Sequence, residues 1–210
     1  MPASDFLRTQ LAGLLVRQPQ LLPTGLPSLP LYIALGTGIG THSRVDLGLF
    51  AEAYGTRLPY SFESVYQAFA SQISTNYTVA NPQGTYTEAA LFDQDVATTS
   101  LTASVSAGAT SLPVDGSTSP GVNGSTLAGQ YTTIYIADTT NPEYASIATT
   151  ALAGATTWTL QSGLQYAHAS GVGITAFTGN ALALVNFPQS QVNATGQALT
   201  VQFTLLMQST

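Results

Sequence analysis

The sequence predicts a mainly β protein with a short N-terminal helix and two sandwich- or barrel-like β modules, the second inserted into the first. Three observations favour this fold class. Helical spacing of apolar residues is clear only near the N-terminus. Short strand-like runs separated by turn residues fill most of the remaining chain. Two well-patterned strands then close the chain, after a long segment of different composition.

The N-terminal segment predicts a helix and then an extended strap. In residues 4–18, Ser4 can cap the helix and Asp5 suits its first turn. Apolar residues follow at helical spacing: Phe6, Leu7, Leu11, Leu14 and Leu15. Prolines are dense in residues 19–30, which favours extended chain. The segment lacks the apolar core and cleavage site of a signal peptide, so we expect it to belong to the fold.

The segment that follows mixes clear and ambiguous strand signals. Residues 31–35 and 57–62 suggest strands or extended chain, and residues 44–53 a turn or short helix. Residues 63–76 suit a helix or a long irregular strand, because four-residue apolar spacing occurs together with β-branched and aromatic side chains. Residues 77–80 and 86–92 predict a hairpin around the turn Asn-Pro-Gln-Gly.

The composition changes after residue 96, where Thr, Ser, Ala and Gly become dominant up to about residue 177. Short strand candidates alternate there with turn signals, which predicts a small sandwich or barrel. The candidates are residues 101–105, 111–114, 131–137, 143–149, 157–160 and 173–177.

Residues 181–187 and 198–207 predict two strong closing strands. An isolated hairpin is only marginally stable, so these strands need partners, and the natural partners lie before residue 96. The segment between must then be an insertion, of the kind tolerated at loop tips. The predicted division is a helix and strap at 1–30, a discontinuous outer β domain at 31–96 and 177–210, and an inserted module at 97–176.

Charge limits the possible partners. Only 7% of residues are charged, the net charge is −6, and the basic residues Arg8, Arg17, Arg44 and Arg57 all precede residue 58. Nucleic-acid binding needs a basic footprint, and an anionic membrane surface would repel this chain. A neutral polar surface suits assembly, because little charge is desolvated when partners dock; an ordinary Thr-rich secreted β protein is the alternative. The chain has no cysteine and no apolar run that predicts membrane insertion.

Both modules resemble phage structural proteins. FLRTQLAGLLVRQ, the proline-rich lead into LYIALGTGIGT, YTEAALFD and the closing ALALVNFPQSQVNATGQALTVQFTLLM are similar to the tail-fibre and tail-collar-type family of virion proteins, over about half the chain. In that family the Leu-Phe-Asp segment runs through a short loop into the last hairpin, whereas here some eighty residues intervene. The insert resembles a small β module of phage structural proteins, most specifically at LQYAHASG (residues 164–171).

This resemblance implies a self-assembling virion component without chemistry. The implied partners are further copies of the chain, as a trimer or hexamer, and other virion structural proteins. The implied location is the virion, assembled in the host cytoplasm. Its place on the particle stays open between tail, neck, baseplate, fibre attachment and capsid decoration or head fibre. The insert is a candidate receptor- or glycan-binding module.

The glycine-rich run at residues 36–41 could in principle bind phosphate. Gly36, Gly38 and Gly40 alternate, but no clear helix follows them, and a P-loop would need a lysine that this chain does not have. We expect a flexible turn after a strand. The histidines His42 and His168 stand outside any nucleophile elbow, so we expect them to pack in a loop and at the end of the insert's last hairpin.

The remaining candidates for chemistry are carboxylates and tyrosines. Asp93 and Asp95 suggest either a Ca²⁺ cage or, with Glu88, a glycosidase pair, but acids at a domain junction are usually solvated turn residues. In the insert, half-buried packing is the main expectation for four tyrosines and a carbohydrate-binding surface the alternative. They are Tyr131, Tyr135, Tyr144 and Tyr166. We predict no catalytic, cofactor or metal residues, and no enzymatic activity.

Overall fold

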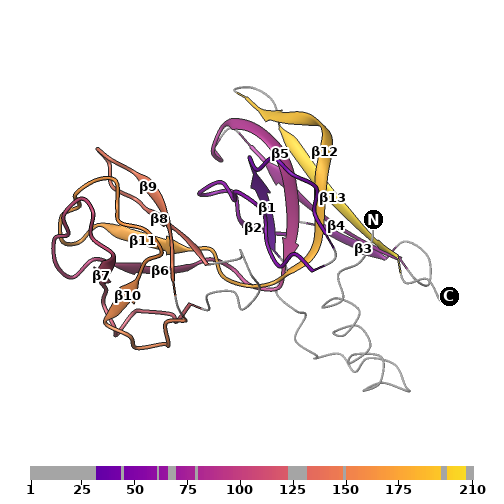
Figure 1. The fold of residues 1–210 in the computed structure, drawn as a ribbon. Helices are drawn as coiled ribbons and strands as arrows, with labels where there is room; N and C mark the ends of the chain where they lie inside the picture. Colours follow the sequence, from indigo (N-terminus) through magenta and orange to yellow (C-terminus); the bar gives the residue numbers. More distant parts are fainter. Residues whose placement is uncertain are drawn as a thin grey trace, which may run out of the picture. The chain divides into compact units, whose positions relative to one another are not determined.

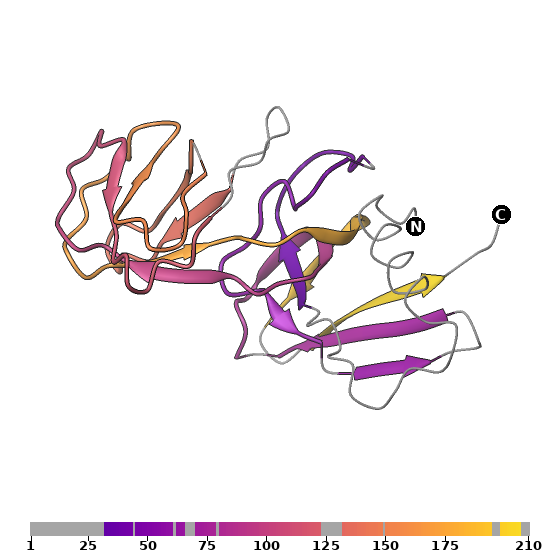
Figure 2. The same ribbon diagram turned by 90° about the horizontal axis from the view of Figure 1, so that it is seen from below.

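The computed structural model describes residues 32–43, 45–60, 62–65, 70–78, 80–122, 132–148, 150–194 and 198–206 (Figures 1 and 2). Within them the protein is mainly β, as the sequence predicts, and holds strands but no helix. The predicted helix and proline strap at residues 1–30 lie outside the described residues.

The chain divides into two compact units. The outer unit consists of Met1–Asp95 and Gly179–Thr210, and the insert is the continuous segment Val96–Thr178. The change of composition along the sequence predicts these boundaries after residues 96 and 176. Each unit has its own core, and each is described separately below.

The outer unit contains two antiparallel sheets. One has the order β12-β5-β1-β2 and the other the order β13-β4-β3. The strands of the first sheet are β1 (Tyr32–Gly36), β2 (Leu58–Pro59), β5 (Gly84–Phe92) and β12 (Ala181–Asn193). Those of the second are β3 (Phe62–Val65), β4 (Ala70–Tyr77) and β13 (Leu199–Leu206). The last two strands therefore pair with β5 and β4, which confirms that their partners lie before residue 96.

The two sheets of the outer unit share one apolar core, in a sandwich-like arrangement. Alternation along β1 directs Ile33 and Leu35 into this core, where they join Phe203 of β13. The Tyr77 hydroxyl is buried and donates to the carbonyl of Ile33 at 2.8 Å, which links β4 to β1. This hydrogen bond satisfies a phenol group that would otherwise be costly to bury.

The opposite face of β1 and β5 is also covered. Ala34 and Phe92 point to this face, and Leu49 packs against them from the segment that joins β1 to β2. We call this segment, residues 37–43 and 45–57, the covering loop. Its backbone is fixed to β1 where the Ala53 amide donates to the Leu35 carbonyl at 2.9 Å.

Two sequence expectations about pairing were wrong. Residues 77–80 and 86–92 do not form a hairpin, because β4 and β5 belong to different sheets. The two closing strands likewise do not pair with each other but pair with strands of different sheets. Of the two alternatives for residues 63–76, the described part favours strand: Phe62–Val65 and Ala70–Tyr77 pair antiparallel. The described part of residues 44–53 forms bends and a single β-bridge rather than a helix.

The insert contains a four-stranded sheet of order β6-β11-β8-β9 and a two-stranded sheet of β10 and β7. Its strands are β6 (Ala97–Ser100), β7 (Ser111–Pro113), β8 (Thr133–Ile136), β9 (Glu143–Ser146), β10 (Thr157–Thr159) and β11 (Gly173–Ala176). The core holds Trp158, which is fully buried, together with Ile134, Ile136 and Ile174. Predicted strands lie close to the observed ones except at 101–105, where β6 comes earlier and isolated bridges follow.

Within each unit, the two chain ends that connect to the other unit are neighbours. In the outer unit Phe92 pairs with Ala181, and just beyond them the Asn180 amide donates to the Asp93 carboxylate at 2.7 Å. In the insert the first strand residue, Ala97, pairs with the last, Ala176. In each unit, therefore, the two chain segments that lead to the other unit are antiparallel neighbours.

Candidate functional site

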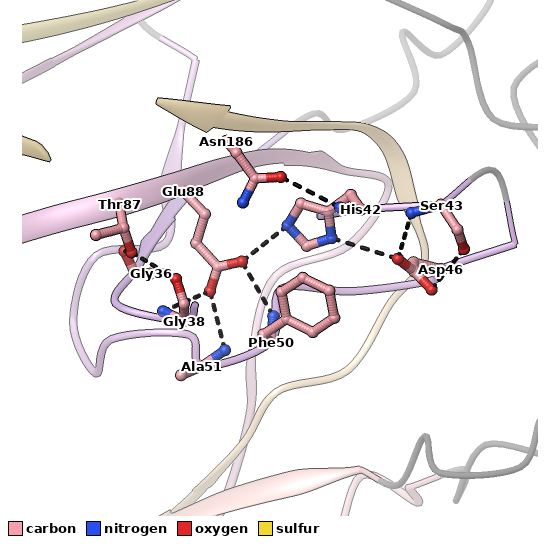
Figure 3. A network of polar contacts seen from close by, with 10 residues as sticks. All are labelled: Gly36, Gly38, His42, Ser43, Asp46, Phe50, Ala51, Thr87, Glu88 and Asn186. Atoms are coloured by element: carbon pink, nitrogen blue, oxygen red, sulfur yellow. Dashed lines mark hydrogen bonds and ion pairs between the residues drawn. The ribbon is translucent and has the colours of Figure 1, made fainter. Parts of the chain in front are cut away.

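A buried carboxylate lies beneath the covering loop. Glu88 is on β5, on the face that the loop covers, and its side chain is fully buried. Its Oε1 accepts hydrogen bonds from the amides of Gly38 at 3.0 Å and Ala51 at 2.9 Å, and Oε2 accepts from Phe50 at 3.1 Å (Figure 3). One carboxylate thus joins the start of the covering loop to residues 50 and 51 in its second half.

His42 completes this cluster from the tip of the loop. Its Nε2 lies 2.8 Å from Oε2 of Glu88, and its Nδ1 lies 3.5 Å from Oδ2 of Asp46. The imidazole stacks on Phe50, with ring centroids 4.3 Å apart and an angle of 4° between the planes. The His42 amide donates to the Asn186 side chain at 3.2 Å, which links the loop to β12 (Figure 3).

The glycines of the GTGIGT run are required by close packing around Glu88. A Cβ atom on Gly36 would lie 2.4 Å from Oε1 of Glu88, and one on Gly38 would lie 2.5 Å from the same atom. A Cβ on Gly40 would lie 2.8 Å from the Phe50 ring. The run is therefore a packed segment that surrounds a carboxylate rather than the flexible turn that the sequence suggested.

The hydrogen bonds decide the protonation of Glu88. Burial alone would raise its pKa, but the bonds from His42 and from the amides of Ala51, Phe50 and Gly38 outweigh burial and lower it. Glu88 is therefore ionised near neutral pH. A carboxylate that accepts several backbone N–H bonds is strongly stabilised in this form.

The loop held by Glu88 exposes apolar side chains. Ile39 is 96% exposed, Val45 61% and Phe50 49%. Ile39 lies between Gly38, which packs against Glu88, and Gly40, which packs against the Phe50 ring, and Phe50 donates its own amide to that carboxylate. The chain thus presents apolar groups on a backbone that a buried charge fixes in place.

The insert contains a second histidine–carboxylate cluster. The His168 side chain is fully buried, with Nε2 2.7 Å from Oε1 of Glu143 and Nδ1 3.0 Å from Oδ2 of Asp138. Glu143 also accepts from the amides of Gln165 at 2.8 Å and Tyr166 at 3.1 Å. The hydrogen bond from His168, followed by those from the amides of Thr140 and Asn141, lowers the pKa of Asp138.

A third buried charge fixes the end of the covering loop. The Arg57 guanidinium makes a two-pronged contact with Glu52, at 2.8 Å from Nε and 2.5 Å from Nη2. It lies over the ring of Phe92 at 3.7 Å and donates to the Gln94 carbonyl at 3.1 Å. Burial raises the pKa of Glu52, and the attraction of Arg57 opposes the rise.

Neither histidine has the geometry of a serine triad. A triad places a nucleophile's hydroxyl on one ring nitrogen and an acid on the other, whereas His42 and His168 each face a carboxylate on both sides. Ser43, next to His42, donates to Asp46 at 2.9 Å instead of to the imidazole. The hydrogen bonds and ion pairs of these clusters hold loop segments against strands.

The other candidates are dispersed. Asp93 accepts from the Asn180 amide as a junction residue, and Glu88 is used by the covering loop. No group of three His, Cys, Asp or Glu side chains suited to a metal ion occurs among the described residues. Tyr131 lies outside the described residues, and Tyr166 is 37% exposed. Tyr135 and Tyr144 are cross-strand neighbours, with ring centroids 4.9 Å apart.

Sequence reasoning named both histidines but not their partners. Asp46, Asp138 and Glu143 carried no separate prediction, and Glu88 was considered only as a catalytic acid. One signal was available: Glu88 is a single acid followed by the apolar run Ala-Ala-Leu-Phe on a strand. A carboxylate on a buried strand must be paired, because burying it without a partner would cost too much desolvation free energy.

Comparison with known proteins does not identify the chain. No protein-family model, no curated protein and no solved structure matches it. Among the described residues no helix is long and apolar enough to cross a membrane. Its function therefore has to be inferred from its own residues.

Proposed function

We propose that this protein is a structural component of a tailed-phage virion that acts by self-assembly and by docking to other virion proteins. The sequence resemblance supplies the class of particle. The arrangement of the outer unit supports the mode of action, because its buried charges serve to hold a loop that exposes the large apolar side chains of Ile39, Val45 and Phe50.

The observation that carries the proposal is the exposure of Ile39 on a fixed backbone. An isoleucine that is 96% exposed is unfavourable in water, and here it is surrounded by glycines whose packing leaves the loop little freedom. Fixing a contact residue in advance lowers the entropy cost of association. Ile39, together with the exposed Val45 and Phe50 of the same loop, thus has the properties expected of a docking contact.

The charge composition supports the same conclusion. Charged residues make up 7% of the chain, and several of them pair internally: Arg57 with Glu52, His42 with Glu88, and His168 with Glu143. Such a surface loses little hydration energy when identical subunits pack together. A homo-oligomer on the particle, without enzymatic activity, is therefore the proposed state.

The direct test is to detect the protein on phage particles. An antibody raised against the purified chain should label intact particles in electron micrographs, at one site of the tail, neck, baseplate or fibre attachment. Regular labelling over the whole head would instead indicate a capsid decoration or head-fibre protein. Particles that carry none of the protein would overturn the proposal.

The docking role of the covering loop is tested separately in solution. Light scattering after size exclusion should show an oligomer for the wild type and a shift toward monomer for Ile39→Asp. The matched control is Leu152→Asp, since Leu152 is 74% exposed but lies in the insert. A wild-type chain that is monomeric at high concentration and binds no particle protein would refute self-assembly, and equal effects of the two variants would refute the role of the loop.

A further inference from the structure

One face of the insert's four-stranded sheet is aromatic and uncharged. On β8, Ile134 and Ile136 point into the core, so Tyr135 between them points to the opposite face. Strand register extends this face in a row, because Tyr135 pairs with Tyr144 on one side and with Thr175 on the other. The face carries Thr98, Thr133, Tyr135, Tyr144, Ser146, Thr175 and Phe177, of which Thr175 is buried.

Three aromatic rings lie together on this face. The rings of Tyr135 and Tyr144 have centroids 4.9 Å apart, and those of Tyr144 and Phe177 are 6.2 Å apart with only 19° between their planes. Tyr144 remains 50% exposed despite both neighbours. Packing of the rings on one another therefore leaves about half of Tyr144 in contact with solvent, beside the partly buried rings of Tyr135 and Phe177.

The charges of the insert limit what can cover this area. Residues 96–178 contain three acids, Asp115, Asp138 and Glu143, and no lysine or arginine. Two of the acids are held by His168. An anionic ligand would meet no cation here and would be repelled by the acids, so nucleic acid, sulfated sugars and sialylated sugars are disfavoured.

We propose that this face binds a neutral carbohydrate. A sugar ring has an apolar C–H side, which packs on aromatic rings, and hydroxyls around its edge, which exchange hydrogen bonds with groups such as those of Thr98, Thr133 and Ser146. The face offers both kinds of contact and no charge that would have to be desolvated. The inference goes beyond the assembly role and holds whether or not the covering loop docks to other subunits.

The first experiment uses the full-length chain on an array of neutral, sulfated and sialylated oligosaccharides. Binding should be confined to neutral glycans, and the best of them should then be titrated by calorimetry. Tyr144→Ala should weaken this affinity about tenfold or more, since it removes the most exposed ring of the cluster. The matched control Tyr54→Ala removes a ring that is 41% exposed in the outer unit, and should leave the affinity unchanged.

A second measurement avoids any dependence on variant folding. Nitration of tyrosines in the wild-type chain, mapped by mass spectrometry, should be suppressed at Tyr144 by the bound neutral oligosaccharide and unchanged at Tyr54. No binding to any neutral glycan, equal loss in the two variants, or equal protection of the two tyrosines would each overturn the proposal. Saturable binding of a particle protein to this face in place of a glycan would overturn it too, while leaving the assembly role standing.

Discussion

Each of the two units contains a buried histidine that lies between two carboxylates. In each, one buried histidine has a glutamate at Nε2 and an aspartate at Nδ1, at 2.8 and 3.5 Å for His42 and at 2.7 and 3.0 Å for His168. In each, the glutamate also accepts backbone amides, which are three for Glu88 and two for Glu143.

The difference lies in what the cluster holds. Glu88 fixes a loop whose residues are 37 to 50 positions away, and the loop exposes apolar side chains. Glu143 and His168 join the turn after β8 to the segment after β10, and no comparable apolar residue is exposed by the residues they fix except Tyr166. The same polar arrangement thus presents apolar side chains in the outer unit and joins two segments of the fold in the insert.

The largest expected effect is the loss of Glu88. Glu88→Gln removes the charge that His42 and three amides bind, and should lower the free energy of unfolding of the outer unit by about 3–5 kcal/mol. Chemical denaturation measures this, and Asp46→Asn, at the more exposed end of the same histidine, should cost much less. An equal loss of unfolding free energy in the two variants would contradict the conclusion that Glu88 is the main partner of the loop.

The glycine packing gives the next effect. Gly38→Ala places a methyl group 2.4 Å from the Phe50 Cβ and 2.5 Å from Glu88, and should cost about 1–3 kcal/mol in the outer unit. Gly48→Ala in the same loop is the matched control, because nothing lies within 4 Å of its Cβ position. If thermal melting shifts equally in both variants, the covering loop is not packed as described.

The insert should respond more locally. His168→Gln leaves Glu143 with its amide bonds but without its ring partner, and should destabilise the insert by about 2–3 kcal/mol. Hydrogen exchange should speed up at residues 138–143 and 164–168, while the amides of Gly38 and Ala51 keep their protection. Faster exchange in both units would mean that they unfold together rather than separately.

The smallest expected effect is a loss of folding stability at acid pH. The lowered pKa values of Glu88 and Asp138 mean that the folded state holds these protons less tightly than the unfolded state. Their stabilisation is complete above the unfolded values of about 4 and is lost as the pH falls through the folded values. Glu52 has a raised pKa and contributes with the opposite sign. Melting temperature should therefore decline below about pH 4, and less steeply in Glu88→Gln; an unchanged slope in that variant would argue against this account.

The sequence carries the class of fold but not its pairing. The apolar run at β1, the alternation in β13 and the turn residues of the insert predicted strands that the structure contains. The hairpin expected at residues 77–92 failed because neighbouring strands in a sandwich often cross to the other sheet, and no local pattern distinguishes a crossing from a turn. The partners of Glu88 were out of reach for a similar reason, since amides 37, 38 and 50 positions away meet it only once the loop has folded over β5.

The closely spaced connections between the units have an evolutionary consequence. Because Phe92 pairs with Ala181 and Ala97 pairs with Ala176, each unit presents its two joined chain ends as neighbours. A module with adjacent ends can be exchanged for another, or for a short turn, without changing the register of the host sheet or adding much loop entropy. The outer unit can therefore accept a different segment between Asp93 and Asn180 while keeping its own sheets and core.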